Sequence, residues 1–185
     1  MKLVQKKVIM NKSEMARSLR RLAYEIIEKI HNDDNLVLVG IQTRGVYLAQ
    51  RIGNEIKNIS RKTVPIGTLD ITLYRDDVDA VANQPTVKET KLPFDITGKD
   101  VILVDDVLFT GRTIRAALDE IIDFGRPKTI KLAVLIDRGC RELPIQPDFA
   151  GERFPTSRKE AVNVSLEEID KQDSVILYNK KITKA

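Results

Sequence analysis

Three apolar runs with few or no interruptions mark the chain: Leu36–Ile41, Val101–Val104 and Ile130–Ile136. Strands that are buried on both faces of a parallel sheet have this continuous pattern, whereas strands with one wet face alternate apolar and polar residues. A fourth run, Val175–Tyr178, predicts one more short strand. The pattern therefore predicts a parallel sheet built on three buried strands.

Segments with helical periodicity alternate with these runs. Asn11 and Glu14 have the spacing of a helix-starting capping box. The helix after them is predicted to bury Met15, Leu19, Leu22, Ala23, Ile26, Ile27 and Ile30. Later helices are predicted to bury Val46, Leu48, Ala49, Ile52 and Ile56, and then Ile114, Ala117, Leu118, Ile121 and Ile122. Strands that alternate with helices predict an α/β fold with an open, mostly parallel sheet flanked by helices.

The tail has a different pattern. Pro155–Arg158 predicts a turn, Val162–Val164 alternates in polarity, and Val175–Tyr178 is the short strand named above. We expect the N- and C-terminal segments, including the first helix, to form a small hood over the sheet edge. No repeat, low-complexity stretch or linker interrupts the chain, so residues 1–185 are predicted to form one domain.

Composition narrows the possible classes of protein. The chain is 42% hydrophobic and 31% charged, its net charge is +4, and it lacks an apolar run of membrane-spanning length. The first residues lack the apolar core of a signal peptide. The single Cys140 excludes an internal disulfide, and the single His31 excludes histidine-based zinc clusters and disfavours a Ser-His-Asp triad. We therefore expect a cytoplasmic protein without a membrane partner.

The buried run Val101–Val104 leads into the most specific motif. Asp105 and Asp106 are predicted to end the strand, and Thr110-Gly111-Arg112-Thr113 then turns into a helix. Backbone N–H groups at such a turn bind an anion, helped by the helix dipole. The carboxylates can accept hydrogen bonds from sugar hydroxyls or attract Mg²⁺. The pattern indicates a site for a phosphorylated sugar; an ordinary strand end with solvated acids is the alternative. No ATP P-loop motif is present.

Two other predicted strands end in polar turns. Thr43 and Arg44 follow the first strand, and Asp137 and Arg138 follow the third. The carboxyl ends of parallel strands share one edge, so these turns should converge with the acidic pair. Asp76–Asp95 has few apolar residues and is predicted to be a lid that excludes water from the site.

An apolar strand, Asp-Asp and Thr-Gly-x-Thr together resemble the signature of the type I phosphoribosyltransferases. The resemblance implies that family's fold, with a hood, and a cis peptide bond before or within the Thr43–Arg44 turn. It also implies catalytic roles for Asp105 and Asp106 and magnesium as cofactor. The implied contacts to phosphoribosyl diphosphate or nucleotide are Thr43, Arg44, Asp105, Asp106, Val107, Leu108, Phe109, Thr110, Gly111, Arg112 and Thr113.

Further segments resemble one bacterial subfamily, the bifunctional regulators of pyrimidine operons. These segments are Leu69–Asp77, Asp137–Pro144 and Pro155–Arg158. The resemblance implies transfer of ribose 5-phosphate from phosphoribosyl diphosphate to uracil, giving UMP, with Arg138 and Val162 at the base. It implies binding of messenger RNA leader hairpins, controlled by UMP or UTP, by a homodimer or larger assembly. Asp137 is a candidate metal contact, directly or through water, or a base, with a structural role as the alternative.

A basic face of the first helix is the candidate RNA surface. Arg17, Arg20 and Arg21 could contact phosphates and Tyr24 could stack on a base, although a solvated charged face has the same spacing. Arg141 is a further candidate RNA contact. The chain departs from the subfamily pattern at Arg20, Cys140 and Gln146, where threonine, histidine and arginine are common. Three alternatives stay open: transfer to another base, an enzyme without an RNA role, and an RNA-binding regulator with vestigial catalysis.

Overall fold

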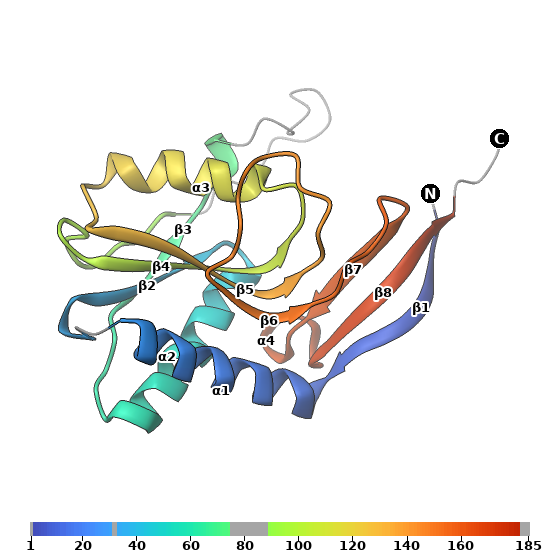
Figure 1. The fold of residues 1–185 in the computed structure, drawn as a ribbon, viewed down its shortest axis with the longest axis horizontal. Coiled ribbons are helices and arrows are strands. Elements are labelled where there is room, and N and C mark those ends of the chain that lie inside the picture. The colour runs from blue at the N-terminus through green and yellow to red at the C-terminus, as the bar shows by residue number, and fades with distance from the viewer. Residues whose placement is uncertain (1, 31–32, 75–88, 182–185) are drawn as a thin grey trace.

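A five-stranded parallel sheet forms the centre of the molecule (Figure 1). The computed structural model describes residues 2–30, 33–74 and 89–181. In spatial order the strands are β3 (Ile66–Leu69), β2 (Leu36–Ile41), β4 (Asp100–Leu108), β5 (Thr129–Asp137) and β6 (Phe149–Arg153), with every neighbouring pair parallel. The predicted α/β class is confirmed, because its three buried strands lie side by side at the middle of the sheet.

Helices cover both faces of this sheet. Helices α1 (Lys12–Lys29) and α2 (Arg44–Ser60) pack on one face, and α3 (Arg112–Asp123) packs on the other (Figure 1). Strand β2 serves both layers, since Leu36 and Leu38 join the core beneath α1 and α2 while Val37 and Val39 join the core beneath α3. This two-sided burial is why β2 has a continuous apolar sequence.

The predicted capping box at the start of α1 is present. Asn11 Oδ1 accepts a hydrogen bond from the N–H of Glu14 at 3.0 Å, and Glu14 Oε2 accepts one from the N–H of Asn11 at 2.8 Å. The predicted apolar face of α1 is buried or half-buried throughout. In α3 one predicted core residue is wrong: Ile122 is 59% exposed, because it lies at the edge of the apolar face that Ala117 and Ile121 bury.

Strand β4 is longer than its apolar run. The acidic pair was expected to end it, but the ladder with β5 continues through Asp105–Val134 and Leu108–Asp137. Pairing with β2 stops earlier, at Val104. The prediction was wrong because hydrogen bonds to one neighbouring strand are enough to continue a strand whose side chains are polar.

The hood is a separate antiparallel sheet with the order β1-β8-β7. Its strands are β1 (Lys2–Asn11), β7 (Glu160–Ser165) and β8 (Ser174–Lys181), and the short helix α4 (Glu167–Asp170) lies between β7 and β8. The expectation that the first helix belongs to the hood is wrong, since α1 packs on the central sheet. Two register irregularities interrupt the pairing of β1 with β8, so β1 lacks the clean alternation that would have predicted it.

One ion pair ties the two edges of the hood together. Lys6 on β1 contacts Glu160 at the start of β7, with Nζ 2.5 Å from Oε1. Lys6 and the backbone N–H of Ser157 hold the pKa of Glu160 at about 2, below the usual value. The carboxylate therefore stays ionised at neutral pH and keeps these contacts.

Two other predictions concern the surface. Positions 76–88 of the predicted lid, Asp76–Asp95, lie outside the described residues. In the described remainder of this segment, Lys91 forms a β-bridge with Thr68 on the edge strand β3. Among the residues that the structure describes, no helix has the length and apolar character needed to span a bilayer.

Candidate active site

The chain reverses its direction across the sheet between β2 and β4. Strand β3 adds to one side of β2 and β4 to the other, so the connections after β2 and β4 leave in different directions. In open α/β sheets a ligand binds in the crevice that this divergence creates at the carboxyl ends of the strands. Thr43–Arg44 follow β2, and Asp105–Asp106 lie on β4 just beyond its last pair with β2, at Val104.

The signature loop encloses a pocket at the start of α3. Its volume is about 200 Å³ and its lining is continuous in sequence, from Val107 to Ile114. Gly111 is the N-cap of α3 with φ of 94°, a left-handed conformation that favours glycine. Gly111 has no side chain to cap the helix, and the N–H of Arg112 makes only a long hydrogen bond, 3.4 Å, to the Thr110 hydroxyl. An anion in the pocket can replace that contact, and the start of a helix favours negative charge. This arrangement suits a sugar phosphate.

The two carboxylates beside this pocket are held by the backbone. Asp105 Oδ1 accepts a hydrogen bond from the N–H of Asp106, and Asp106 Oδ1 accepts one from the N–H of Val107, both at 2.9 Å. Burial raises the pKa of Asp106, and the positive charge of Arg44 opposes that shift. A desolvated carboxylate next to an arginine is a strong acceptor for ribose hydroxyls and interacts strongly with positive charge.

Two glycines allow the Thr43–Arg44 turn to sit against the acidic strand. A Cβ on Gly45 would overlap the carbonyl oxygen of Val104 on β4, and one on Gly40 would overlap the backbone of Val46. Only glycine permits this close approach of α2 to the sheet. The peptide bond between Gln42 and Thr43 is cis, as the family resemblance implied.

Arg138, the first residue after β5, turns its side chain inward. Arg138 is 4% exposed, stacks on the Phe109 ring at 4.1 Å and donates hydrogen bonds to the Thr156 hydroxyl and the Ser157 carbonyl. Its guanidinium thus packs between the signature loop, at Phe109, and the loop before β7, at Thr156 and Ser157. Any contact with a base would come from its backbone. Val162, the other predicted base contact, is half-buried on β7.

Arg141, a predicted RNA contact, makes several contacts within its own loop, and its role towards RNA stays a prediction. Its guanidinium donates to the carbonyl oxygens of Phe109 and Ile145, both at 2.9 Å, and pairs with Asp137 at 2.6 Å. An RNA phosphate would have to replace these contacts within the loop. The same contact engages Asp137, whose Oδ1 also accepts from the N–H of Gly139, which favours its structural role over a metal contact.

The basic face of α1 is exposed, but its arginines have partners. Arg17 donates to the Ser13 hydroxyl, Arg20 pairs with Glu55 at 3.1 Å, and Arg21 pairs with Glu25 at 2.6 Å. Exposed ion pairs contribute at most about 1 kcal/mol each, so a phosphate can displace them. Arg21 also donates a hydrogen bond to the carbonyl oxygen of Gly151. Tyr24 lies on the same helix and is 54% exposed.

The acidic pair fits a magnesium ion that is shared with a substrate. Within the described residues, no group of three or more His, Cys, Asp or Glu side chains is arranged to hold a metal. Asp105 and Asp106 supply the hard oxygen ligands that Mg²⁺ prefers. In proteins this ion is often held by one or two carboxylates together with waters and substrate phosphates.

Fold and site together define a phosphoribosyltransferase domain. The family model described as phosphoribosyl transferase domain matches residues 7–168. The crystal structure of Trypanosoma cruzi hypoxanthine phosphoribosyltransferase superposes with a TM-score of 0.72 at 15% identity, covering 96% of this chain and 98% of its own. A Bacillus anthracis hypoxanthine-guanine phosphoribosyltransferase gives 0.70 at 18%, covering 96% and 99%. These two likenesses show the fold.

Sequence similarity to one group of proteins is much higher. Bifunctional protein PyrR of Pelotomaculum thermopropionicum is 57% identical over 173 residues, which cover 94% of this chain and 96% of that protein. Bifunctional protein PyrR of Thermus aquaticus is 56% identical with the same coverage. The chain therefore belongs to the phosphoribosyl transferase family and, within it, to the bifunctional PyrR proteins.

Proposed function

We propose that this protein transfers ribose 5-phosphate from phosphoribosyl diphosphate to uracil, releasing diphosphate and forming UMP, and that it also regulates pyrimidine genes through messenger RNA. The observation that carries the enzymatic part is the sheet edge at which the signature pocket, the acidic pair and the Thr43–Arg44 turn meet. Membership among the bifunctional PyrR proteins supports the regulatory part.

The signature loop holds the ribose 5′-phosphate. The backbone N–H groups from Phe109 to Thr113 and the hydroxyls of Thr110 and Thr113 surround the pocket that receives it. Asp105 and Asp106 accept the ribose hydroxyls, and their negative charge favours the cationic character that develops at C1′.

On the side of the ribose opposite the 5′-phosphate, Thr43 and Arg44 hold the diphosphate. The bond from C1′ to the diphosphate oxygen breaks, and its electron pair leaves with the diphosphate. Uracil N1 bonds to C1′ as its proton passes to water. Holding both reactants in line supplies much of the rate enhancement. Magnesium, held by Asp105 and Asp106 mainly through water, would neutralise charge on the diphosphate oxygens.

A panel of bases tests the enzymatic proposal. Uracil with phosphoribosyl diphosphate and Mg²⁺ should give UMP and diphosphate, with cytosine, hypoxanthine and guanine turned over at least about a hundredfold less efficiently. Faster turnover of a purine would identify another base as substrate. Absence of turnover with every base would support the regulator with vestigial catalysis.

The exposed face of α1 supports the RNA role. We propose that Arg17, Arg20 and Arg21 contact hairpin phosphates and that Tyr24 stacks on a base when UMP or UTP occupies the nucleotide site. The protein acts as a homodimer or larger assembly of single-domain chains, in which two such faces read one hairpin surface.

Arg20→Ala with Arg21→Ala should weaken binding of the leader hairpin. Loss of two phosphate contacts should also reduce the slope of log affinity against log salt by about two units. The measurement is a titration of hairpin RNA with UMP at several salt concentrations. Arg126→Ala with Lys128→Ala is the matched control, because it removes the same charge at two exposed positions in the loop between α3 and β5, outside α1. If both double variants bind alike, the RNA site lies elsewhere.

A further inference from the structure

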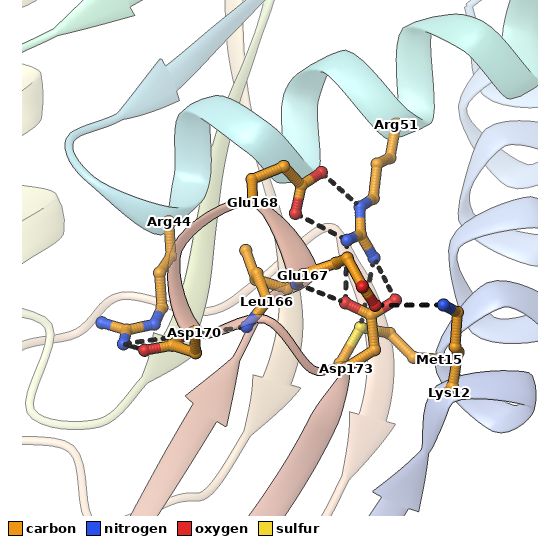
Figure 2. A network of polar contacts seen from close by, with 9 residues as sticks. All are labelled: Lys12, Met15, Arg44, Arg51, Leu166, Glu167, Glu168, Asp170 and Asp173. Atoms are coloured by element: carbon orange, nitrogen blue, oxygen red, sulfur yellow. Dashed lines mark hydrogen bonds and ion pairs between the residues drawn. The ribbon is translucent and has the colours of Figure 1, made fainter.

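The tip of the hood is attached to helix α2 by two arginines. Figure 2 shows Arg44 at the start of α2 reaching Asp170, and Arg51 reaching Glu168 and Asp173. Positions 44 and 51 are two helical turns apart, so both side chains leave the same face of α2. Their acidic partners all come from the segment between β7 and β8.

The two attachments differ in geometry. Arg51 binds both carboxylates through two nitrogens each, at 2.6 to 3.0 Å. Arg44 reaches Asp170 through Nη2 alone, at 3.2 and 3.3 Å to the two carboxylate oxygens. Bidentate pairs between arginine and carboxylate are the strong and specific ones. Arg51 is therefore the structural anchor, and the contact of Arg44 holds its guanidinium by one corner only.

The remaining donors of Arg44 have no partner in the hood. Its Nε is buried and lacks a hydrogen-bond partner among the described residues. A guanidinium has five N–H donors, and a buried donor without a partner is costly. The positive charge of Arg44 also acts on Asp106 across the site. Nε itself is covered, but the side chain is 31% exposed, and Nη1 is not among the buried unpartnered atoms. The donors left for an anion in the crevice are therefore those at the Nη1 end of the guanidinium.

We propose that Asp170 is a positioning residue for the leaving diphosphate: it fixes one corner of the Arg44 guanidinium so that the other donors face the diphosphate. The inference rests on the proposed function, since it assumes that Arg44 binds diphosphate. Asp170 does not touch the substrate and acts through Arg44. The hood, which comes from the far end of the chain, thereby takes part in diphosphate binding.

Asp170→Asn separates this role from a structural one. Asp170 Oδ2 also accepts a hydrogen bond from the N–H of Leu166 at 3.0 Å, and the asparagine amide oxygen preserves that contact while the charge is lost. We expect KM for phosphoribosyl diphosphate and Ki for diphosphate to rise about fivefold, with kcat and KM for uracil changed less than about twofold.

Glu168→Gln is the matched control. It removes one carboxylate from the same hood tip, but Arg51 keeps Asp173 and Arg44 is not touched. A loosened hood would affect both variants alike and would lower their melting temperatures together. We expect Glu168→Gln to leave KM for phosphoribosyl diphosphate and Ki for diphosphate unchanged.

A double-mutant cycle with Arg44→Gln completes the test. Arg44→Gln should raise both diphosphate constants, and adding Asp170→Asn to it should change them by less than about twofold. Equal effects of Asp170→Asn in both backgrounds, no effect, or tighter diphosphate binding would each overturn the positioning role. If Arg44→Gln itself leaves diphosphate binding unchanged, the proposed function of Arg44 fails instead, so the two failures are distinguishable.

Discussion

Asp106→Asn is expected to lower the rate of UMP formation by about a hundredfold or more, which corresponds to at least about 2.7 kcal/mol of transition-state stabilisation. The asparagine can still accept the hydrogen bond from the N–H of Val107, so the geometry of the strand end is kept. What is lost is the negative charge that, in the proposed mechanism, favours the developing cation at C1′. The measurement is initial-rate kinetics with uracil and phosphoribosyl diphosphate.

The stability of this variant should move in the opposite direction from its activity. Burial raises the pKa of Asp106, so ionisation of this carboxyl is less favourable in the folded state than in the unfolded state. At neutral pH the ionised side chain therefore lowers the free energy of unfolding. Asparagine resembles the protonated form and should unfold no earlier than the wild type. Asp119→Asn, on the exposed surface of α3, should change neither property. Wild-type turnover by Asp106→Asn would contradict the role given to this residue.

Gly45→Ala should destabilise the fold by about 3 kcal/mol and displace the diphosphate turn. The new Cβ would overlap the carbonyl oxygen of Val104, a backbone atom that cannot rotate away, so α2 must shift from the sheet. Overpacking of this kind typically costs about 1–3 kcal/mol. Urea unfolding should show the loss of stability, and KM for phosphoribosyl diphosphate should rise because Thr43 and Arg44 move with the helix.

Gly53→Ala in the same helix is the control. There the new Cβ would meet the terminal Cδ1 of Ile66, which can turn aside, and alanine favours the helix by about 1 kcal/mol over glycine. We expect a change in stability within about 1 kcal/mol and unchanged kinetics. Equal effects at both glycines would show that the close approach of α2 to β4 is not the reason why position 45 requires glycine.

Local sequence determined the central sheet and the signature loop. The apolar run of β2, the capping box at Asn11 and the turn at Thr110-Gly111 each depend on neighbours a few residues away. Their residue types restrict the backbone directly: continuous burial requires a continuous apolar run, and a side-chain oxygen three residues before an N–H can cap a helix. These were the predictions that the structure confirmed.

Edge strands were harder to predict from the sequence. Strands β1 and β6 each pair on one side only, and β1 has register irregularities. Such strands owe their conformation to the neighbour that they pair with, not to a strong pattern of their own. The same reason explains why the acidic end of β4 is extended: its partner is β5, which lies beyond α3 in the chain.

Only the tertiary structure decided what the arginines do. Arg44, Arg138 and Arg141 all belong to polar turns at strand ends, and in the sequence all three are equally suited to bind substrate or RNA. Folding turns Arg138 and Arg141 inward and brings Asp170, 126 residues away, to Arg44. A charged side chain takes the partner that folding places within reach, and that distance depends on the whole topology. The sequence by itself therefore determined that a phosphoribosyl site exists, while the tertiary structure decided which of its charges face that site.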